Sequence, residues 1–151
     1  MKKTIFFAAL SLLTIFSCKN DDEEEVGSRT DIVGVWKLKE KTVISGKNGL
    51  VLHTMNVTTC DGNNTYEYSA DKKYKATYYS DASGDCLAVE EVAAKYNYNP
   101  EYHRVTVTFN NGTSEVTNVR ELSGNVMKLE GAPTDYDSDG INDIIVNVYN
   151  K

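Results

Sequence analysis

A run of carboxylates near the C-terminus has the spacing of a cation-binding loop. Aspartate occupies alternate positions at Asp135, Asp137 and Asp139, Gly140 follows, and a further carboxylate comes at Asp143. Carboxylates packed this closely repel one another, and a divalent cation removes that repulsion. Because hard oxygen ligands suit calcium, calcium binding is the first chemistry that the sequence indicates.

The order Asp-x-Asp-x-Asp-Gly matches the opening of an EF-hand calcium loop. On that pattern the ligands are four carboxylates and one backbone carbonyl, supplied by Asp135, Asp137, Asp139, Ile141 and Asp143. Val146 stands where the EF-hand has a bidentate glutamate, and predicted strands flank the loop, so it is more similar to the short Asp-rich loops of thrombospondin type 3 and dockerin repeats. We expect weak affinity, about 10⁻⁴–10⁻³ M. The alternative is a solvated Asp/Gly turn without metal.

Two of the three cysteines can pair with each other. Cys18 belongs to the N-terminal segment, which leaves Cys60 and Cys86. An exported chain folds in an oxidising compartment, so the pair is interpreted as a disulfide, worth about 3–4 kcal/mol on the chain-entropy model. The alternative is two buried thiols. A redox or metal role would call for a close Cys-x-x-Cys pair or a histidine cluster.

Tyrosine is abundant, and six tyrosines have the spacing of strand faces. Alternate positions of a strand share a face, which groups Tyr66 with Tyr68, Tyr74 with Tyr78, and Tyr96 with Tyr98. Each ring offers an apolar body and a hydroxyl that needs a partner. If these faces line an interior, they suit a small amphipathic or aromatic ligand. The alternative is that the rings fill a core or lie on an exposed face.

Residues 1–17 have the pattern of a secretory signal peptide. Lys2 and Lys3 give a positive start, and the apolar run from Ile5 to Phe16 is too short to span a bilayer as a helix. The run ends Ile15-Phe16-Ser17-Cys18, which resembles the lipobox of bacterial lipoproteins. That resemblance implies cleavage before Cys18 and acyl chains on this cysteine, hence a membrane anchor. The alternative is an ordinary signal peptide with a chance cysteine.

Residues 18–30 predict a solvated tether, because Asp21 to Glu25 are five consecutive carboxylates. This stretch resembles the acidic export signal that follows the lipidated cysteine in surface lipoproteins of Bacteroidota. The resemblance implies an exported outer-membrane lipoprotein that faces the outside of the cell. The alternative is a plain linker facing the periplasm.

Residues 31–151 predict one all-β domain, because they are rich in Val, Thr and Tyr and have turn residues at short intervals. Alternation with period two indicates an antiparallel up-and-down meander of about eight or nine strands. Ala88–Lys95 is ambiguous, since it could form a helical turn. The expected strands are Val35–Ser45, Leu50–Thr59, Thr65–Ser69, Tyr74–Tyr79, Ala88–Tyr98, Val105–Phe109, Thr113–Leu122, Val126–Glu130 and Ile144–Tyr149.

The first predicted strand opens with Gly34-Val35-Trp36, a Gly-x-Trp motif. With the cysteine pair and the hairpins that follow, it resembles the lipocalin-like domains of Bacteroidota lipoproteins. The resemblance implies a barrel in which Gly34 permits a tight entry and Trp36 plugs the closed end. Arg120 is a candidate for the arginine that lipocalins place over this tryptophan, although its surroundings do not match the family motif. A β-sandwich is the alternative fold.

Charge and composition narrow the function. After cleavage 14 basic residues face 22 acidic ones, since Lys2 and Lys3 are two of the sixteen, and the net charge of −8 argues against nucleic-acid binding. His53 and His103 lie in no nucleophile or metal motif, so we predict no enzyme. We expect a monomeric, lipid-anchored protein that binds a small amphipathic or hydrophobic molecule. The alternative is a calcium-stabilised structural or adhesive surface module without such a ligand.

Overall fold

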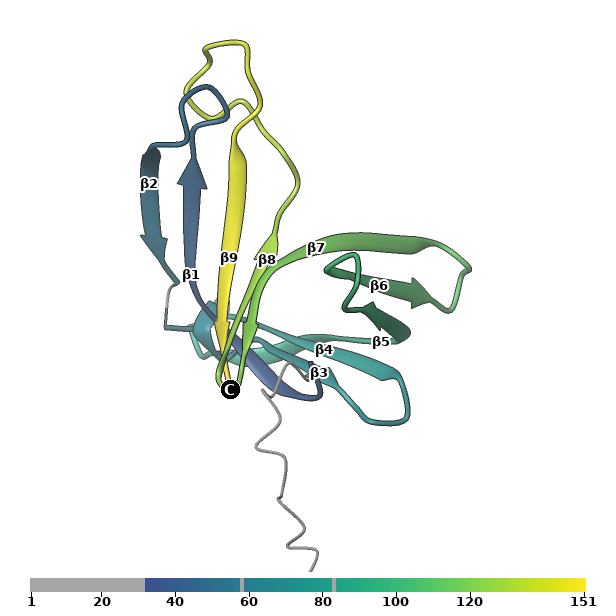
Figure 1. Ribbon diagram of the computed structural model, residues 1–151. Helices are drawn as coiled ribbons and strands as arrows, with labels where there is room; N and C mark the ends of the chain where they lie inside the picture. The colour runs from purple at the N-terminus through teal and green to yellow at the C-terminus, as the bar shows by residue number, and fades with distance from the viewer. Residues whose placement is uncertain (1–31, 58, 83) are drawn as a thin grey trace, which may run out of the picture.

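The computed structural model describes residues 32–57, 59–82 and 84–151 (Figure 1). These residues form nine β-strands and a single turn of 3₁₀ helix, and no helix among them is long and apolar enough to cross a membrane. The elements are β1 (Gly34–Ile44), β2 (Val51–Asn56), η1 (Asp61–Asn63), β3 (Thr65–Tyr68), β4 (Lys73–Ser80), β5 (Leu87–Asn99), β6 (Arg104–Phe109), β7 (Ser114–Ser123), β8 (Val126–Glu130) and β9 (Ile144–Asn150).

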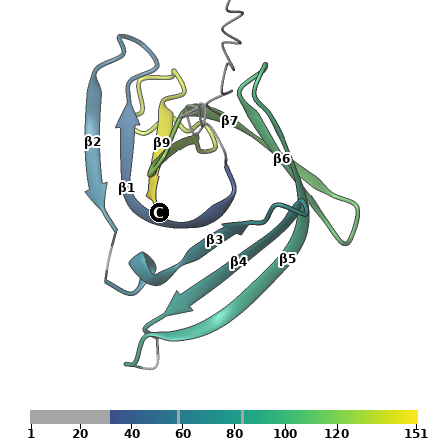
Figure 2. The same ribbon diagram turned by 60° about the horizontal axis from the view of Figure 1, so that its bottom comes forward.

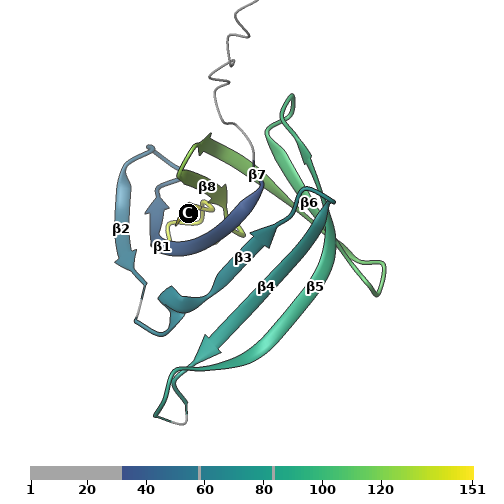
Figure 3. The same ribbon diagram turned by 90° about the horizontal axis from the view of Figure 1, so that it is seen from below.

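The sheet closes on itself. From β3 to β9 each strand pairs antiparallel with the next, and β1 joins the two ends by pairing with both β3 and β9. The result is a closed barrel of eight antiparallel strands, seen end-on in Figure 3, with β2 as an extra strand beside β1. The prediction of an up-and-down barrel is therefore confirmed, and the sandwich alternative is wrong. The segment Ala88–Lys95 is strand, as part of β5.

Strand β1 changes partner along one edge. Its first half, Gly34–Lys37, pairs with β3, and its second half, from Glu40 onward, pairs with β2. Because β2 and β3 pair with different halves of the same edge of β1, they diverge from each other, and η1 lies in the connection between them (Figure 2). On its other edge β1 follows β9, with a register shift between Leu38 and Glu40. This shift is a β-bulge, which reverses the faces of the residues that follow it.

The hydrophobic core fills the end of the barrel where β1 begins. Trp36 is completely buried there, and its indole N–H donates to the carbonyl of Ile32 at 2.7 Å. Ile32, which precedes β1, is itself part of this core. The remaining core residues come from the inner faces of barrel strands, as alternation requires: Leu38, Tyr68, Ala94, Tyr96, Val105, Val107, Val119, Met127, Leu129 and Tyr149. Residues 32–151 thus contain a complete barrel with its own core.

Candidate functional site

The inner wall of the barrel changes from apolar to polar along its length. On β7 the inward residues run from buried Val119 through Thr117 to Glu115, which pair with residues of β8 and β6. On β9 Asn147 follows Tyr149 in the same direction. On these two strands the inward residue near Trp36 is therefore less polar than the one further away, because the rim is hydrated and the floor is not.

A cavity of about 290 Å³ lies above this floor. Its apolar lining comes from four core residues, and nine further residues can hydrogen-bond or carry charge. The apolar set is Leu38, Val105, Val107 and Leu129. The polar set is Lys41, Tyr66, Tyr68, Tyr74, Tyr78, Glu115, Thr117, Asn147 and Tyr149. The cavity is therefore amphipathic, and it is at the small end of the size range of ligand pockets.

Tyrosine rings form one wall of the cavity, and they pack edge against face. The ring of Tyr66 stands perpendicular to Tyr149, with 5.2 Å between centroids, and to Tyr78, at 6.0 Å. Tyr68 contacts Tyr74 at 5.1 Å between centroids, with the ring planes tilted by 54°, one layer deeper. Such pairs stabilise one another beyond the apolar area they bury. The wall is therefore ordered before any ligand arrives.

Burial keeps the hydroxyls of this wall neutral. It raises the pKa of Tyr66 to about 12, and Tyr78 and Asp61 add to that rise. It also raises the pKa of Tyr68, Tyr74 and Tyr149, with smaller contributions from neighbouring tyrosines. Removing a phenol from water disfavours its charged form. At neutral pH these residues present O–H groups that can donate or accept hydrogen bonds.

A second hollow adjoins the first where β2 and β3 splay apart. It has a volume of about 410 Å³ and shares Leu38, Lys41, Tyr66 and Tyr78 with the inner cavity. Its other lining residues come from the end of β2 and from the connection to β3: Met55, Asn56, Val57, Asp61 and Asn64. We call this hollow the side window. Because β1 has changed partner at this level, no strand closes the wall.

The predicted tyrosines do not all reach the cavity. Tyr66, Tyr68, Tyr74 and Tyr78 line it. Tyr96 lies in the core beneath, where its ring contacts Tyr68 and its hydroxyl donates to the carbonyl of Ser69 at 2.9 Å. Tyr98 packs against the core without lining the cavity. Both belong to the inner face, but nearer the closed end.

Sequence reasoning missed four polar residues and one tyrosine of the lining. Tyr149 and Asn147 alternate with the apolar residues of β9, so the sequence shows that they share a face. It does not show whether that face points into the barrel. Thr117 and Glu115 share a face with Val119 in the same manner. Lys41 reaches the interior because of the bulge after Leu38, for which the sequence carries no signal.

The disulfide prediction is confirmed, since Cys60 and Cys86 are bonded with their Cα atoms 5.5 Å apart. The bond joins the connection before η1 to the connection between β4 and β5. A hydrogen bond reinforces it, from the Asn63 side-chain amide to the Cys86 sulfur at 3.3 Å. Nearby, the backbone N–H of Tyr79 donates to the Asn64 side chain at 2.7 Å. Together these contacts fix the lower edge of the side window.

At the closed end the cation over the tryptophan is not Arg120. A register shift between Val119 and Glu121 turns Arg120 outward, where its Nε lies 2.7 Å from Glu130. Instead, the ammonium of Lys151 lies over the Trp36 ring. Gly34 has a φ of 145°, and a Cβ there would meet the Lys151 side chain at 2.6 Å. The glycine thus leaves room for that side chain.

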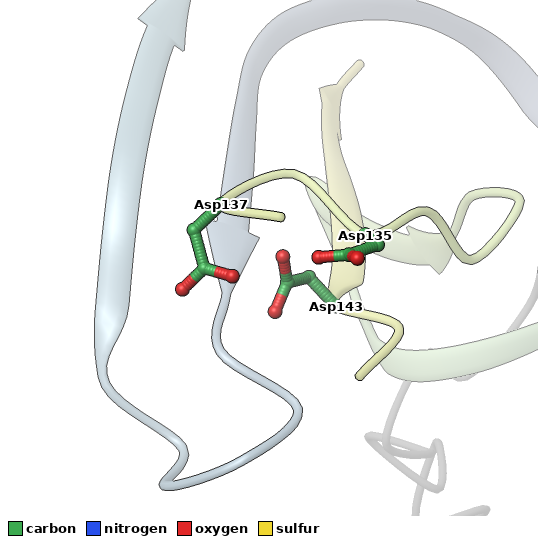
Figure 4. A group of neighbouring side chains, drawn as sticks. All are labelled: Asp135, Asp137 and Asp143. Carbon is green, nitrogen blue, oxygen red and sulfur yellow. The ribbon is translucent and has the colours of Figure 1, made fainter. Parts of the chain in front are cut away.

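The acidic loop stands at the other end of the barrel, beside the β1–β2 hairpin (Figure 1). Asp135, Asp137 and Asp143 turn their carboxylates toward one another (Figure 4), and one oxygen from each lies within 4.8 Å of the others. Asp143 is 1% exposed. Its oxygens accept the backbone N–H of Gly46 at 3.0 Å and of Tyr136 at 2.8 Å, and these contacts, Gly46 first, lower the pKa of this carboxyl.

Asp139 does not belong to this group of described carboxylates. The Asp139 carboxylate accepts the N–H of Ile141 at 2.9 Å and lies 3.5 Å from the Lys47 ammonium. Both Asp135 oxygens also accept backbone donors, from Asp139 and Gly140, each at 3.0 Å. The loop is therefore already held by hydrogen bonds between its carboxylates and its own backbone.

The two histidines lie outside the cavity. His53 stacks on Tyr136 with 5.9 Å between the ring centroids, which joins β2 to the acidic loop. His103 is exposed in the turn before β6, with a φ of 48°. In the described part of the chain, neither histidine belongs to an ion pair or to a group of metal-binding side chains.

Comparison with known proteins decides the family. The model of the lipocalin-like domain matches residues 32–129, which is more than half of the chain. This protein belongs to the lipocalin-like domain family. Lipocalin-like domains generally bind or carry small molecules rather than catalyse reactions. The match ends within β8, so the acidic loop and β9 lie beyond it.

Solved structures give weaker likenesses to this lipocalin-like chain. A bovine lipocalin allergen is 18% identical, with 83% of this chain and 75% of that chain covered and a TM-score of 0.41. A dog lipocalin allergen is 13% identical, with 80% and 74% covered and a TM-score of 0.40. For the odorant-binding protein OBP1 the values are 12%, 79%, 70% and 0.39. No curated protein matches the sequence significantly.

Proposed function

We propose that this lipocalin-like protein binds one small amphipathic molecule inside its barrel. The cavity between the apolar floor and the polar rim is the observation that supports it. An eight-stranded barrel leaves room for one small ligand when its inner side chains do not fill it. Here the space stays open, because the tyrosines pack against one another along the wall.

A fluorescence titration tests this function. The probe is N-phenyl-1-naphthylamine, a neutral aromatic dye, and the protein is the chain from Lys19 onward, which holds the whole barrel. Binding should raise the dye's emission. Thr117→Trp fills the cavity and should weaken binding at least about tenfold, which corresponds to about 1.4 kcal/mol. Equal binding by a correctly folded Thr117→Trp variant would contradict the proposal.

Val116→Trp is the matched control. Val116 neighbours Thr117 on β7 but faces outward and is 61% exposed. The same ring is then added to the same strand without entering the cavity. We expect wild-type affinity for the dye.

We further propose that the protein is exported and anchored by lipid on Cys18, and that it faces the outside of an outer membrane of the Bacteroidota kind. Residues 1–31, which carry this interpretation, lie outside the described residues. An alkyne-labelled palmitate should label the wild type in cells, and Cys18→Ser should remove the label. Protease added to intact cells should digest the anchored protein; protection from protease would indicate the periplasm instead.

A second candidate function is calcium-dependent ordering of the acidic loop. It is favoured by the three carboxylates that converge within 4.8 Å. Calcium at millimolar concentration should then raise the melting temperature, in line with a Kd of about 10⁻⁴–10⁻³ M. Asp137→Asn should abolish the rise, while Asp81→Asn, in the exposed β4–β5 connection, should retain it. An unchanged melting temperature with 10 millimolar calcium, on the order of ten Kd, would contradict this role.

A further inference from the structure

Carboxylates outnumber ammonium groups around the cavity and the side window. Glu115 and Lys41 line the cavity, Asp61 lines the side window, and Glu90 faces Tyr78 across the β4–β5 pairing. In the described part of the chain no ion pair joins Lys41 to Glu115. The chain as a whole has a net charge of −6. A recess lined by an excess of one sign concentrates the field and attracts counter-charges.

The tyrosine wall lies beside these carboxylates. Glu90 and Glu115 both act electrostatically on the Tyr78 hydroxyl, after burial, and raise its pKa. The Tyr66 ring stands perpendicular to the rings of Tyr78 and Tyr149, and all three border the same space. Aromatic faces attract cations through the ring quadrupole, and groups of such rings recognise organic ammonium ions. The wall and the rim therefore favour the same charge.

The protein already places its own ammonium groups on aromatic rings. Lys72 lies over Tyr96 at 5.4 Å from the centroid, and Lys151 lies over Trp36 at 4.5 Å. Both rings belong to the core below the cavity. The inner aromatic residues of this barrel thus accept cations where a lysine reaches them. Inside the cavity, one ammonium, that of Lys41, accompanies five tyrosine rings.

We propose that the ligand of this barrel is a small protonated amine, with its apolar part on the Leu38–Leu129 floor and its ammonium between Glu115 and the Tyr66–Tyr78 pair. This inference rests on the proposed function, because it names the chemical class that the same cavity takes. The amphipathic lining fixes the orientation: the floor excludes the charge, and the rim receives it. Neutral molecules of the same shape bind more weakly, and anions most weakly.

Three indoles with one ring and different side-chain charges test the proposal. They are tryptamine, tryptophol and indole-3-acetate, which are cationic, neutral and anionic at pH 7, titrated by calorimetry into the chain from Lys19 onward. Tryptamine should bind about three- to tenfold more tightly than tryptophol. Indole-3-acetate should bind more weakly than either. Raised salt should reduce the preference for tryptamine, because the rim is hydrated and screened.

Glu115→Gln and Glu67→Gln form the matched pair of variants. Glu115 borders the cavity, whereas Glu67 lies on β3 between Tyr66 and Tyr68 and is exposed on the outer face. Both remove one negative charge close to the tyrosine wall. Glu115→Gln should weaken tryptamine binding about threefold, at roughly 0.6 kcal/mol, and leave tryptophol unchanged. Glu67→Gln should change neither. Lys41→Gln should strengthen tryptamine binding.

The outcomes of these titrations distinguish the proposed amine ligand from the proposed binding function on which it rests. Equal affinity for tryptamine and tryptophol, or an equal response of the two glutamate variants, would overturn the amine ligand and leave the binding function intact. If indole-3-acetate binds most tightly of the three, Lys41 determines the charge of the preferred ligand, and the proposed amine ligand is overturned as well. If none of the three indoles binds, and the neutral dye does not bind either, the binding function itself fails.

Discussion

The ammonium group of Lys151 lies 4.5 Å from the centre of the Trp36 ring. Trp36 is fully buried at the closed end of the barrel, and Lys151 follows directly after β9. The pairing of β1 with β9 brings the two residues together, since Lys37 is opposite Asn150. Lys151 therefore covers Trp36, the largest fully buried side chain among the described residues, at the closed end of the barrel.

Replacing this cation should cost a modest amount of stability. Lys151→Met keeps much of the apolar stem but removes the charge over the ring. The free energy of unfolding in urea should fall by about 0.5–1 kcal/mol, the usual size of a partly exposed cation–π contact. Lys95→Met is the control, because Lys95 is exposed on β5 between two inward residues. Equal losses in both variants would show that the ring does not feel the charge.

Removing the disulfide should have a larger effect. Cys60 and Cys86 are 26 residues apart, and opening that loop in Cys60→Ser/Cys86→Ser should lower the free energy of unfolding by about 3–4 kcal/mol. Urea titration of the double variant measures this. Wild-type protein in a strong reductant should unfold at the same urea concentration. A loss below about 1 kcal/mol would mean that the bond does little to restrict the unfolded chain.

Alkaline pH should destabilise the barrel through the hydroxyls of its buried tyrosines. Burial raises the pKa of Tyr68 and Tyr149 in the folded state, whereas in the unfolded chain these hydroxyls ionise near pH 10. The contribution of these two tyrosines to the free energy of unfolding is complete below pH 10. Above pH 10 it is lost by about 1.4 kcal/mol per pH unit for each tyrosine. Urea titrations at pH 9, 10 and 11 should show this slope.

The variants for this experiment differ in burial. Tyr149→Phe should reduce the slope of the unfolding free energy against pH by the equivalent of about one proton, because it removes the hydroxyl of a buried tyrosine. Tyr102→Phe serves as the control, because it removes the hydroxyl of a residue that is 64% exposed. Phenolate absorbance at 295 nm, an ordinary tyrosine signal, should rise together with unfolding. Free ionisation of all tyrosines in a folded barrel would contradict the prediction.

A methyl group at position 46 should loosen the acidic loop. A Cβ on Gly46 would lie 2.0 Å from the Asn142 carbonyl oxygen, and the Gly46 N–H donates to Asp143. Gly46→Ala should therefore lower stability by about 1–3 kcal/mol, as overpacking usually does. Amide exchange at Tyr136 and Asp143 should accelerate. Gly124→Ala, with open space at its Cβ, is the control and should change neither property.

Much of the fold was readable because its strands are locally regular. Alternation of Val and Thr marked Val105–Phe109, and β6 begins one residue earlier, at Arg104. The structure also resolves the ambiguity of Ala88–Lys95, since the segment pairs as strand with β4 from Ala88 to Lys95 and with β6 at Ala94 and Lys95. Of the candidate site, the four tyrosines on β3 and β4 were found, because two neighbouring strands rich in tyrosine stand out by composition.

The rest of the site depends on contacts between distant segments. A strict alternation from Trp36 and Leu38 would turn Glu40 inward, but the shift against β9 turns Lys41 inward instead. A similar shift on β7 sends Arg120 outward and leaves the place over Trp36 to Lys151. A single extra residue in a strand thus exchanges its two faces, and its position is set by the partner strand rather than by the strand's own sequence.

The sequence by itself determined the approximate positions of the strands along the chain, the pairing of Cys60 with Cys86, and the presence of a tyrosine-rich face and an acidic loop. These follow from residue type and local spacing, on which alternation, turns and cysteine pairing depend. Tertiary structure alone decided that the tyrosines enclose a cavity, that Glu115 and Lys41 share its rim, and that β2 leaves a side window. Those features arise where β1 meets three other strands, and no local pattern in β1 records which partner each half will take.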